Sequence, residues 1–319
     1  MLRPQRFEHE VDPGPIQIQP RKVHFDFSDS PLHWIPGHPV ASDMVGILNV
    51  VLPAAERWFV AVYNEVLPLV KDPKLAEDMR GFMGQEAIHA DVHEQALHEF
   101  MEERGFDPKP ILDQIEYSFS KVLGPSMSTN PRRRHNQLCD RLWFIAALEH
   151  YTAVLGDFAL NSAWDDFDAD PTFVDLFRWH AAEEVEHRNV AHDVATYFSN
   201  SYLDRVSAML MASTFMFVMF QRVAWYLVKT DPEVDFGWLA FNRLRYLDSK
   251  KRLLPRYRSS SAPTPLTTFG PDSRPRRWGR RRRRWPIWPV RRPRVPLISD
   301  GTVSADRRRP AQRLGPVPP

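Results

Sequence analysis

The chain has 319 residues, of which 43% are hydrophobic and 26% are charged, so it can bury a sizeable core and is not disordered as a whole. Its single cysteine, Cys139, excludes a disulfide framework, a Cys-based zinc site and an iron–sulfur cluster. The N-terminal residues contain no apolar signal segment, so a cytoplasmic location is expected.

The net charge of +2 conceals two regions of opposite charge. Residues 256–319 hold 17 Arg, no Lys, three Asp and no Glu, a balance of +14, which leaves 25 basic and 37 acidic residues before them. Residues 251–319 are predicted to form a disordered tail, because a composition rich in Arg and Pro cannot bury a core. Such a tail can attract an anionic partner, but an incidental extension is favoured and no specific nucleic-acid partner is predicted.

The remainder of the chain divides into an arm and a helical domain. Residues 1–40 are polar, Pro-rich and without helical period, which predicts an extended arm over the core. Residues 41–250 are helical in pattern and contain four long segments, with one long connection after the second: 42–70, 73–104, 135–164 and 172–199. Asp170 followed by Pro171 is typical of a helix start. The pattern predicts an all-α, ferritin-like four-helix bundle with a crossover and additional C-terminal helices.

A fifth segment, residues 204–229, is apolar but is interrupted by Gln221 and Arg222, and its uncharged run is shorter than a membrane span usually needs. We expect a helix that packs on the bundle, with peripheral membrane contact as the alternative. Its four methionines are expected to fill the core rather than to bind metal. Oligomerisation is left open.

Two glutamates stand almost alone in apolar helical segments. Glu56, with Arg57 as its only charged neighbour, has apolar residues on either side at helical spacing. Glu149 lies in the same way within the apolar run 142–156. An ionised carboxylate buried in such a place costs several kcal/mol unless a cation meets it. Both glutamates are therefore predicted to bind metal.

The second and fourth segments each supply a Glu-x-x-His pair, Glu86 with His89 and Glu184 with His187. A spacing of three places both side chains of a pair on one helix face. One Glu from each of two helices, plus Glu-x-x-His from each of two others, is the ligand set of di-iron and di-manganese carboxylate bundles. We therefore predict two divalent cations, with iron favoured over manganese because imidazole ligands suit iron.

Two further histidines, His93 and His180, fall on the same helix faces and are candidate extra ligands. His180 is the stronger candidate and is included in the predicted set. The predicted metal ligands are Glu56, Glu86, His89, Glu149, His180, Glu184 and His187. The four glutamates among them are the predicted catalytic residues, and which pair of them bridges the cations is left open.

Residues around the ligands are expected to support them. Glu183, Asp157 and Asp193 are candidate hydrogen-bond partners of the imidazoles, although Glu183 could instead pair with His187 as a surface contact. Four aromatic residues near the ligands are expected to line an apolar pocket: Phe59, Phe82, Tyr151 and Trp179.

Taken in order, these motifs resemble a bacterial family described as predicted metal-dependent hydrolases. The resemblance covers about residues 20–250 and is carried by RKVHFDFSDSPLHWIPGHP, LPAAERWFV, GFMGQEAIHADVH, ALEHYTA and WHAAEEVEH. The site layout is also similar to that of ribonucleotide reductase small subunits, bacterial multicomponent monooxygenases and ferritins. The pattern around His180 resembles that of the di-iron arylamine N-oxygenases. The resemblance implies metal-dependent activity on a ferritin-like fold.

Three functions are compatible with this site, and only analogy ranks them. The favoured hypothesis is a di-iron oxidoreductase or oxygenase that uses dioxygen and an electron donor on an apolar small molecule. The first alternative is a di-metal hydrolase, as the family is described, because two cations can activate water and polarise a carbonyl or phosphoryl oxygen. The second alternative is a non-catalytic ferritin-like metal-binding protein.

Overall fold

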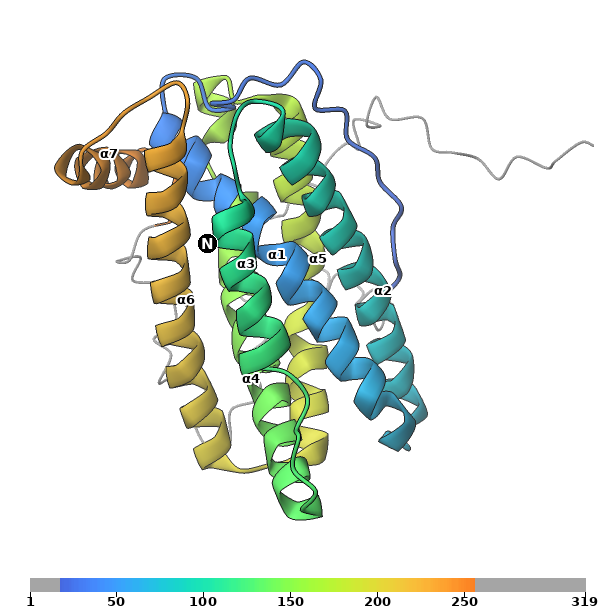
Figure 1. Cartoon of the computed structure of the whole chain (residues 1–319). Coiled ribbons are helices and arrows are strands. Elements are labelled where there is room, and N and C mark those ends of the chain that lie inside the picture. The colour runs from blue at the N-terminus through green and yellow to red at the C-terminus, as the bar shows by residue number, and fades with distance from the viewer. Residues whose placement is uncertain (1–17, 256–319) are drawn as a thin grey trace, which may run out of the picture. The chain divides into compact units, whose positions relative to one another are not determined.

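The computed structural model describes residues 18–255, and every regular element in that range is a helix (Figure 1). The predicted all-α class is confirmed. Four long helices carry the candidate site: α1 (Pro39–Val66), α2 (Pro73–Ala96), α4 (Pro131–Leu160) and α5 (Pro171–Phe198). The ferritin-like relationship of this bundle stays a prediction. Most of the predicted basic tail and the first residues of the predicted arm lie outside the described residues.

Three of these four helices begin in the same way. A short polar side chain at the N-cap accepts hydrogen bonds from two backbone N–H groups of the first turn, and proline follows at the first helical position. The N-caps are Asp72 before α2, Asn130 before α4 and Asp170 before α5. The helix start predicted at Asp170 is thus confirmed, and Asp170 also accepts a hydrogen bond from the Ser30 hydroxyl of the arm.

Shorter elements connect the long helices: η1 (Leu67–Leu69), the π-helical η2 (Leu97–Glu102), α3 (Lys109–Tyr117), the π-helical η3 (Ser118–Val122) and η4 (Trp164–Phe167). The long connection between α2 and α4 contains η2, α3 and η3. It returns the chain along the bundle, so that α4 can pack beside α5 (Figure 1).

Two helix pairs form the bundle, α1 with α2 and α4 with α5, and α2 also contacts α5. The α4–α5 pair is the closest, because Gly156 of α4 faces the backbone of α5. A Cβ atom at Gly156 would lie 2.9 Å from the carbonyl oxygen of Ala181. Ala181 follows His180 directly, so this close approach positions part of the candidate site.

The arm residues 18–38 contain no helix or strand and run along α2. Gly81 and Gly84 of α2 make this possible, because a Cβ atom at either position would collide with Ile18 or Pro20 of the arm. The arm is therefore held against the helix that carries Glu86 and His89.

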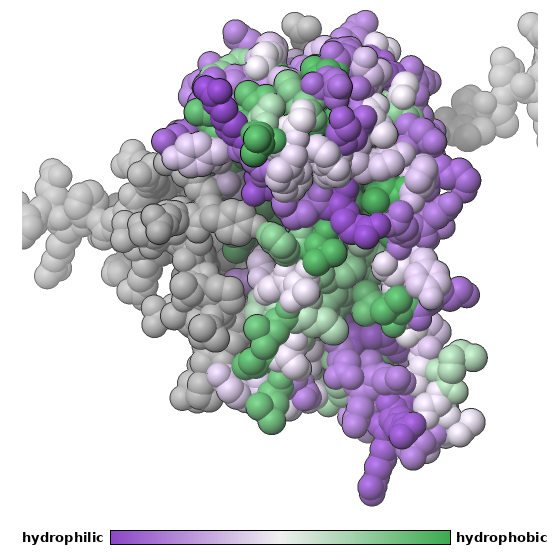
Figure 2. All heavy atoms as spheres, turned by 60° about the vertical axis from the view of Figure 1, so that its left-hand side comes forward, coloured by the Kyte–Doolittle hydropathy of each residue, from purple (hydrophilic) through white to green (hydrophobic). Residues whose placement is uncertain are grey.

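A fifth long helix, α6 (Tyr202–Thr230), packs on α4 and α1 and is followed by α7 (Trp238–Lys250). Its other side carries exposed apolar residues: Leu203, Leu210, Met211, Phe217 and Val218. Figure 2 shows apolar surface on the face of the molecule that includes α6. The expectation that its methionines all fill the core is wrong for Met211, which is 44% exposed.

Two helical stretches in the described range are long and apolar enough to cross a membrane, Pro39–Leu69 and α6. The first is 72% buried over its most apolar window, as expected for a core helix, whereas α6 is only 28% buried. Peripheral membrane contact through residues 204–229 therefore stays a prediction.

The contact at Gly156 leads to a test of the packing. We expect Gly156→Ala to destabilise the protein, although alanine favours a helix over glycine by roughly 0.5–1 kcal/mol, because the new methyl group collides with the backbone at Ala181. Gly46→Ala in α1 is the matched control, since a Cβ atom there has no neighbour within 4 Å. Urea unfolding should show a lower midpoint for Gly156→Ala and an unchanged or higher midpoint for Gly46→Ala. Equal midpoints would contradict the close approach.

Candidate metal centre

The structure brings all seven predicted ligands together in the middle of the bundle. Each is at most 6% exposed: Glu56 from α1, Glu86 and His89 from α2, Glu149 from α4, and His180, Glu184 and His187 from α5. Six of them form two groups whose potential ligand atoms lie within 4.8 Å of one another: Glu56, His89, His180 and Glu184; and Glu86, His89, Glu184 and His187. Glu149 joins the second group through its Oε2 atom, 3.7 Å from Nδ1 of His187.

In both His89 and His187, one ring nitrogen faces the site carboxylates. The other ring nitrogen forms a hydrogen bond to a residue outside the predicted ligand set. Nε2 of His89 lies 2.9 Å from Oε2 of Glu183, and Nε2 of His187 lies 2.9 Å from the amide oxygen of Gln85. An amide oxygen only accepts hydrogen bonds, so Nε2 of His187 carries the proton. Its Nδ1 lies 2.7 Å from Oε1 of Glu86, so this nitrogen faces the carboxylates and can bind a cation that displaces its proton.

A chain of three side chains fixes His180 in the same manner. The amide oxygen of Asn49 lies 2.7 Å from Nδ1 of His93, and Nε2 of His93 lies 2.7 Å from Nδ1 of His180. If His93 donates to Asn49, its Nε2 accepts from His180, and Nε2 of His180 keeps its lone pair. That atom lies 3.0 Å from Glu184 and 3.7 Å from Glu56. His93 therefore positions His180 and is not itself a ligand.

The carboxylates have the features expected of metal ligands. Both oxygens of Glu56, Glu86 and Glu149 are buried without a hydrogen-bond partner, as is Oε2 of Glu184. Burial and the charge of Glu86 raise the pKa of Glu56 well above its ordinary value, and burial and the charge of Glu184 do the same for the pKa of Glu149. Divalent cations would satisfy these oxygens and remove the repulsion, so the residues present fit a metal centre.

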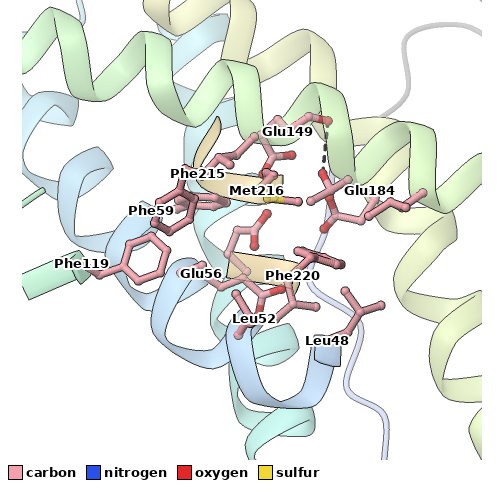
Figure 3. Close-up of a pocket in the computed structure, with 16 residues that line it drawn as sticks. Leu48, Leu52, Glu56, Phe59, Phe119, Glu149, Glu184, Phe215, Met216 and Phe220 are labelled. Atoms are coloured by element: carbon pink, nitrogen blue, oxygen red, sulfur yellow. Dashed lines mark hydrogen bonds between the residues drawn. The ribbon is translucent and has the colours of Figure 1, made fainter. Parts of the chain in front are cut away.

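A narrow cavity lies against the carboxylate side of the centre. Figure 3 shows Glu56, Glu149 and Glu184 beside it, together with apolar side chains of α1 and α6. Its volume is about 30 Å³, enough for one or two water molecules. All four glutamates line it and none of the histidines does. The imidazoles therefore hold the centre from one side, and the cavity gives access from the other.

The N-terminal arm supports the outer partners of two histidines. Arg21 donates a 2.6 Å hydrogen bond to Oε1 of Glu183, whose other oxygen faces His89. The side-chain amide of Gln85 donates to the carbonyl oxygen of Gln19 while its oxygen faces His187. Sequence reasoning missed the roles of Arg21, Gln85 and Asn49, although all three lie within or next to the conspicuous motifs.

Several expectations about the surroundings need correction. Glu183 is fully buried and partners His89, so its pairing with His187 at the surface is wrong. The side chain of Asp193 is 68% exposed and approaches His192 instead of a ligand. Asp157 accepts a hydrogen bond from the side-chain amide of Asn161 near the end of α4.

Only one of the four aromatic residues expected to line the pocket, Phe59, lines this cavity. Phe82 and Trp179 instead pack on the imidazoles of His187 and His89, with ring centroids 4.7 and 5.0 Å apart. The Tyr151 hydroxyl lies 2.6 Å from that of Ser213 on α6. Two of these residues therefore orient ligands rather than contact substrate.

Comparison with known families places the chain in one class. Residues 19–276 match the family described as "Predicted metal-dependent hydrolase", and the chain belongs to this family. No curated protein and no solved structure matches the sequence. The family description favours the hydrolase alternative over the oxidoreductase hypothesis that the sequence alone placed first.

The outer hydrogen bonds lead to a prediction about metal affinity. We expect Gln85→Ala to weaken cation binding about 10–100-fold, because Nε2 of His187 loses the acceptor that orients the ring. Gln95→Ala is the control on the same helix, since Gln95 bonds only to Phe25 and Glu99. Competition with a chromophoric chelator measures both affinities. An unchanged affinity for Gln85→Ala would show that this hydrogen bond does not hold the ligand.

The protonation of His187 leads to a pH dependence. Burial lowers the pKa of His187, but the charges of Glu86 and Glu184 outweigh it and raise the pKa to about 9 in the metal-free protein. This raised pKa stabilises the metal-free fold fully below about pH 6.5, and the contribution is lost as the pH rises through 9. A cation must displace the same proton, so its affinity should rise with pH, about tenfold per unit for each proton displaced.

Cation titrations of the chelator-treated protein between pH 7 and 9 check this dependence. Repeating them in two buffers that differ in ionisation enthalpy counts the protons released. An affinity that is constant over this interval, with no proton release, would contradict the assignment of His187.

Proposed function

We propose that the chain is a metal-dependent hydrolase that holds two divalent cations in the bundle interior. The observation that carries the proposal is the pair of overlapping ligand groups, which share Glu184 and His89. A carboxylate has two oxygens and can bind two cations at once, whereas one imidazole nitrogen binds a single cation. Glu184 is therefore the residue suited to bridge the cations.

The remaining residues divide between the two positions. Glu56 and His180 would hold one cation with Glu184, because Nε2 of His180 lies near both carboxylates. Glu86, Glu149 and His187 would hold the other, because Nδ1 of His187 lies near both of these glutamates. Nδ1 of His89 lies 3.8 Å from Glu86 and 3.5 Å from Glu184. It would therefore bind the cation at one of the two positions. The four carboxylates carry a charge of −4, which matches two divalent ions.

Two adjacent cations, when bound, supply an activated water and a Lewis acid for a carbonyl or phosphoryl oxygen. The protein supplies the rest. The cavity beside Glu56 and Glu149 has room for the water that hydrolysis consumes. Its walls exclude bulk solvent, which strengthens the electrostatic interactions of the bound substrate. The family description supports this function.

The cavity walls favour substrates with an apolar group next to the reacting bond. Among the described residues that line the cavity, Thr152 is the only polar one besides the four glutamates, and its hydroxyl already donates to the carbonyl oxygen of Glu149. The other lining residues are apolar, among them Phe59, Phe119 and Phe220. A small carboxylic ester with an apolar acyl group fits this chemistry, since its only polar group would face the cations.

One observation favours oxygen chemistry as a second candidate. A narrow, largely apolar cavity of about 30 Å³ also suits a diatomic gas, and a carboxylate–histidine centre suits iron. An iron-loaded oxidoreductase that acts on an apolar molecule is the corresponding function. It needs an electron donor, whereas hydrolysis needs none.

The decisive experiment compares metal content and turnover. We expect Glu149→Ala to lose at least one cation per chain and to lower hydrolysis of p-nitrophenyl acetate more than about 100-fold, because a ligand is removed outright. Glu94→Ala is the control, as Glu94 lies on the surface of α2 and pairs with Arg57. Elemental analysis and the release of nitrophenol, measured without oxygen after loading with zinc or manganese, check both results.

The other outcomes identify the competing functions. Unchanged metal stoichiometry in Glu149→Ala would contradict its role as a ligand. Absence of ester and phosphoester hydrolysis, with dioxygen consumption by the reduced iron-loaded protein, would favour the oxidoreductase. No turnover, with iron uptake beyond two per chain, would favour a metal-binding protein without catalysis.

A further inference from the structure

A second cluster of potential ligands lies where the arm meets the ends of two helices. His33 comes from the arm, Asp43 from the first turns of α1, and Asp231 from the residue that ends α6. One ligand atom of each lies within 4.8 Å of the others. Nε2 of His33 is 2.7 Å from Oδ2 of Asp231. Asp43 and Asp231 are only 6% and 7% exposed, so this is not an acidic surface patch.

Asp43 is the unexplained member of the cluster. Its Oδ2 atom is buried and has no hydrogen-bond partner. Burial and the charge of Asp231 raise the pKa of Asp43 well above its ordinary value. Two carboxylates at such a place repel each other unless a proton or a cation lies between them.

Oδ2 of Asp43 is the unpartnered ligand atom of the cluster, whereas Nε2 of His33 and Oδ2 of Asp231 are hydrogen-bonded to each other, a contact that a cation between them would replace. Oδ1 of Asp231 accepts a 2.8 Å hydrogen bond from the backbone N–H of Glu233, which leaves Oδ2 facing His33. Oε2 of Glu233 lies 3.4 Å from Nδ1 of His33, and its side chain is 58% exposed. An imidazole with two carboxylates is a ligand set for zinc or manganese, and a water would complete the coordination.

We infer that His33, Asp43 and Asp231 bind one divalent cation, zinc or manganese, that fastens the arm to α1 and α6. The site is separate from the bundle centre. Asp43 precedes Glu56 by 13 residues on the same helix, which corresponds to about 20 Å along the helix axis. The inference does not depend on the proposed hydrolase activity, since this cation would be structural.

The competing explanation is a proton shared between Asp43 and Asp231. The variant Asp43→Asn distinguishes the shared proton from the cation. Asparagine has the shape of a protonated aspartate and still donates a hydrogen bond to Asp231. As a cation ligand, however, it lacks the negative charge. A shared proton therefore predicts little effect of Asp43→Asn, and a cation site predicts loss of the cation.

The test uses the full chain, purified without chelator, and zinc and manganese measured by elemental analysis. We expect Asp43→Asn to contain one cation per chain less than the wild type, while it keeps the cations of the bundle centre. Glu149→Ala should show the reverse pattern, losing cation from the bundle and keeping this one. Zinc chloride added to chelator-treated Glu149→Ala should raise Tm by several degrees, and the double variant with Asp43→Asn should show a smaller increase, because only the bundle position without Glu149 can still bind zinc.

Equal cation content in the wild type and Asp43→Asn, with the same zinc-dependent increase in Tm, would overturn the inference and establish the shared proton. If circular dichroism shows that Asp43→Asn does not fold, His33→Gln decides by the same comparison. A negative result for the second site would not bear on the bundle centre, because different variants test the two sites.

Discussion

The structure depends on four carboxylates placed in the middle of a helical bundle, seven of whose eight oxygens have no hydrogen-bond partner among the described residues. Each bundle helix supplies one of them, Glu56, Glu86, Glu149 and Glu184, and all are at most 3% exposed. Taking an ionised carboxylate out of water costs several kcal/mol, and neighbouring like charges add to that cost. Such an interior holds either protons or cations, and its cost to stability supports the proposal that the arrangement serves a function.

The two sides of the candidate centre differ: one carries the imidazoles and the other carries the carboxylates and the cavity. The arm contacts the residues that support the imidazole side. The imidazoles lie towards α2 and α5, where Glu183, Gln85 and His93 fix their outer nitrogens. The arm holds two of these partners through Arg21 and Gln19. The opposite side offers carboxylates and apolar walls to the cavity. A substrate of the proposed hydrolase would therefore approach without disturbing the imidazole rings, and the described part of the arm supports the site although it supplies no ligand to the bundle centre.

The sequence predicts the ligands better than their surroundings, for a physical reason. Glu56 and Glu149 stand out because burying a carboxylate in an apolar helix costs free energy that no structural role recovers. The spacing of Glu86 and His89 places both on one helix face. Gln85, Asn49 and Arg21 are ordinary polar residues until tertiary packing brings them beside an imidazole. Phe82 and Trp179 lie close to ligands in sequence, but their positions around the helix turn them towards the rings and away from the cavity. The pattern of a single sequence does not give the distances between side chains of different helices, so these contacts could not be predicted from it.

In the proposed hydrolase, selection of the substrate would depend on α6 more than on the metal ligands. A cavity of about 30 Å³ admits water but no ester of ordinary size, so a larger substrate requires its wall to move. Phe215, Met216 and Phe220 of α6 form part of that wall (Figure 3), and α6 packs on α1 and α4. Its side-chain ties to the rest of the bundle include the Tyr151–Ser213 hydrogen bond, beside the cavity. In the proposed hydrolase the bundle would fix where the cations bind, while α6, less buried than the other long apolar helix, α1, would control what reaches them.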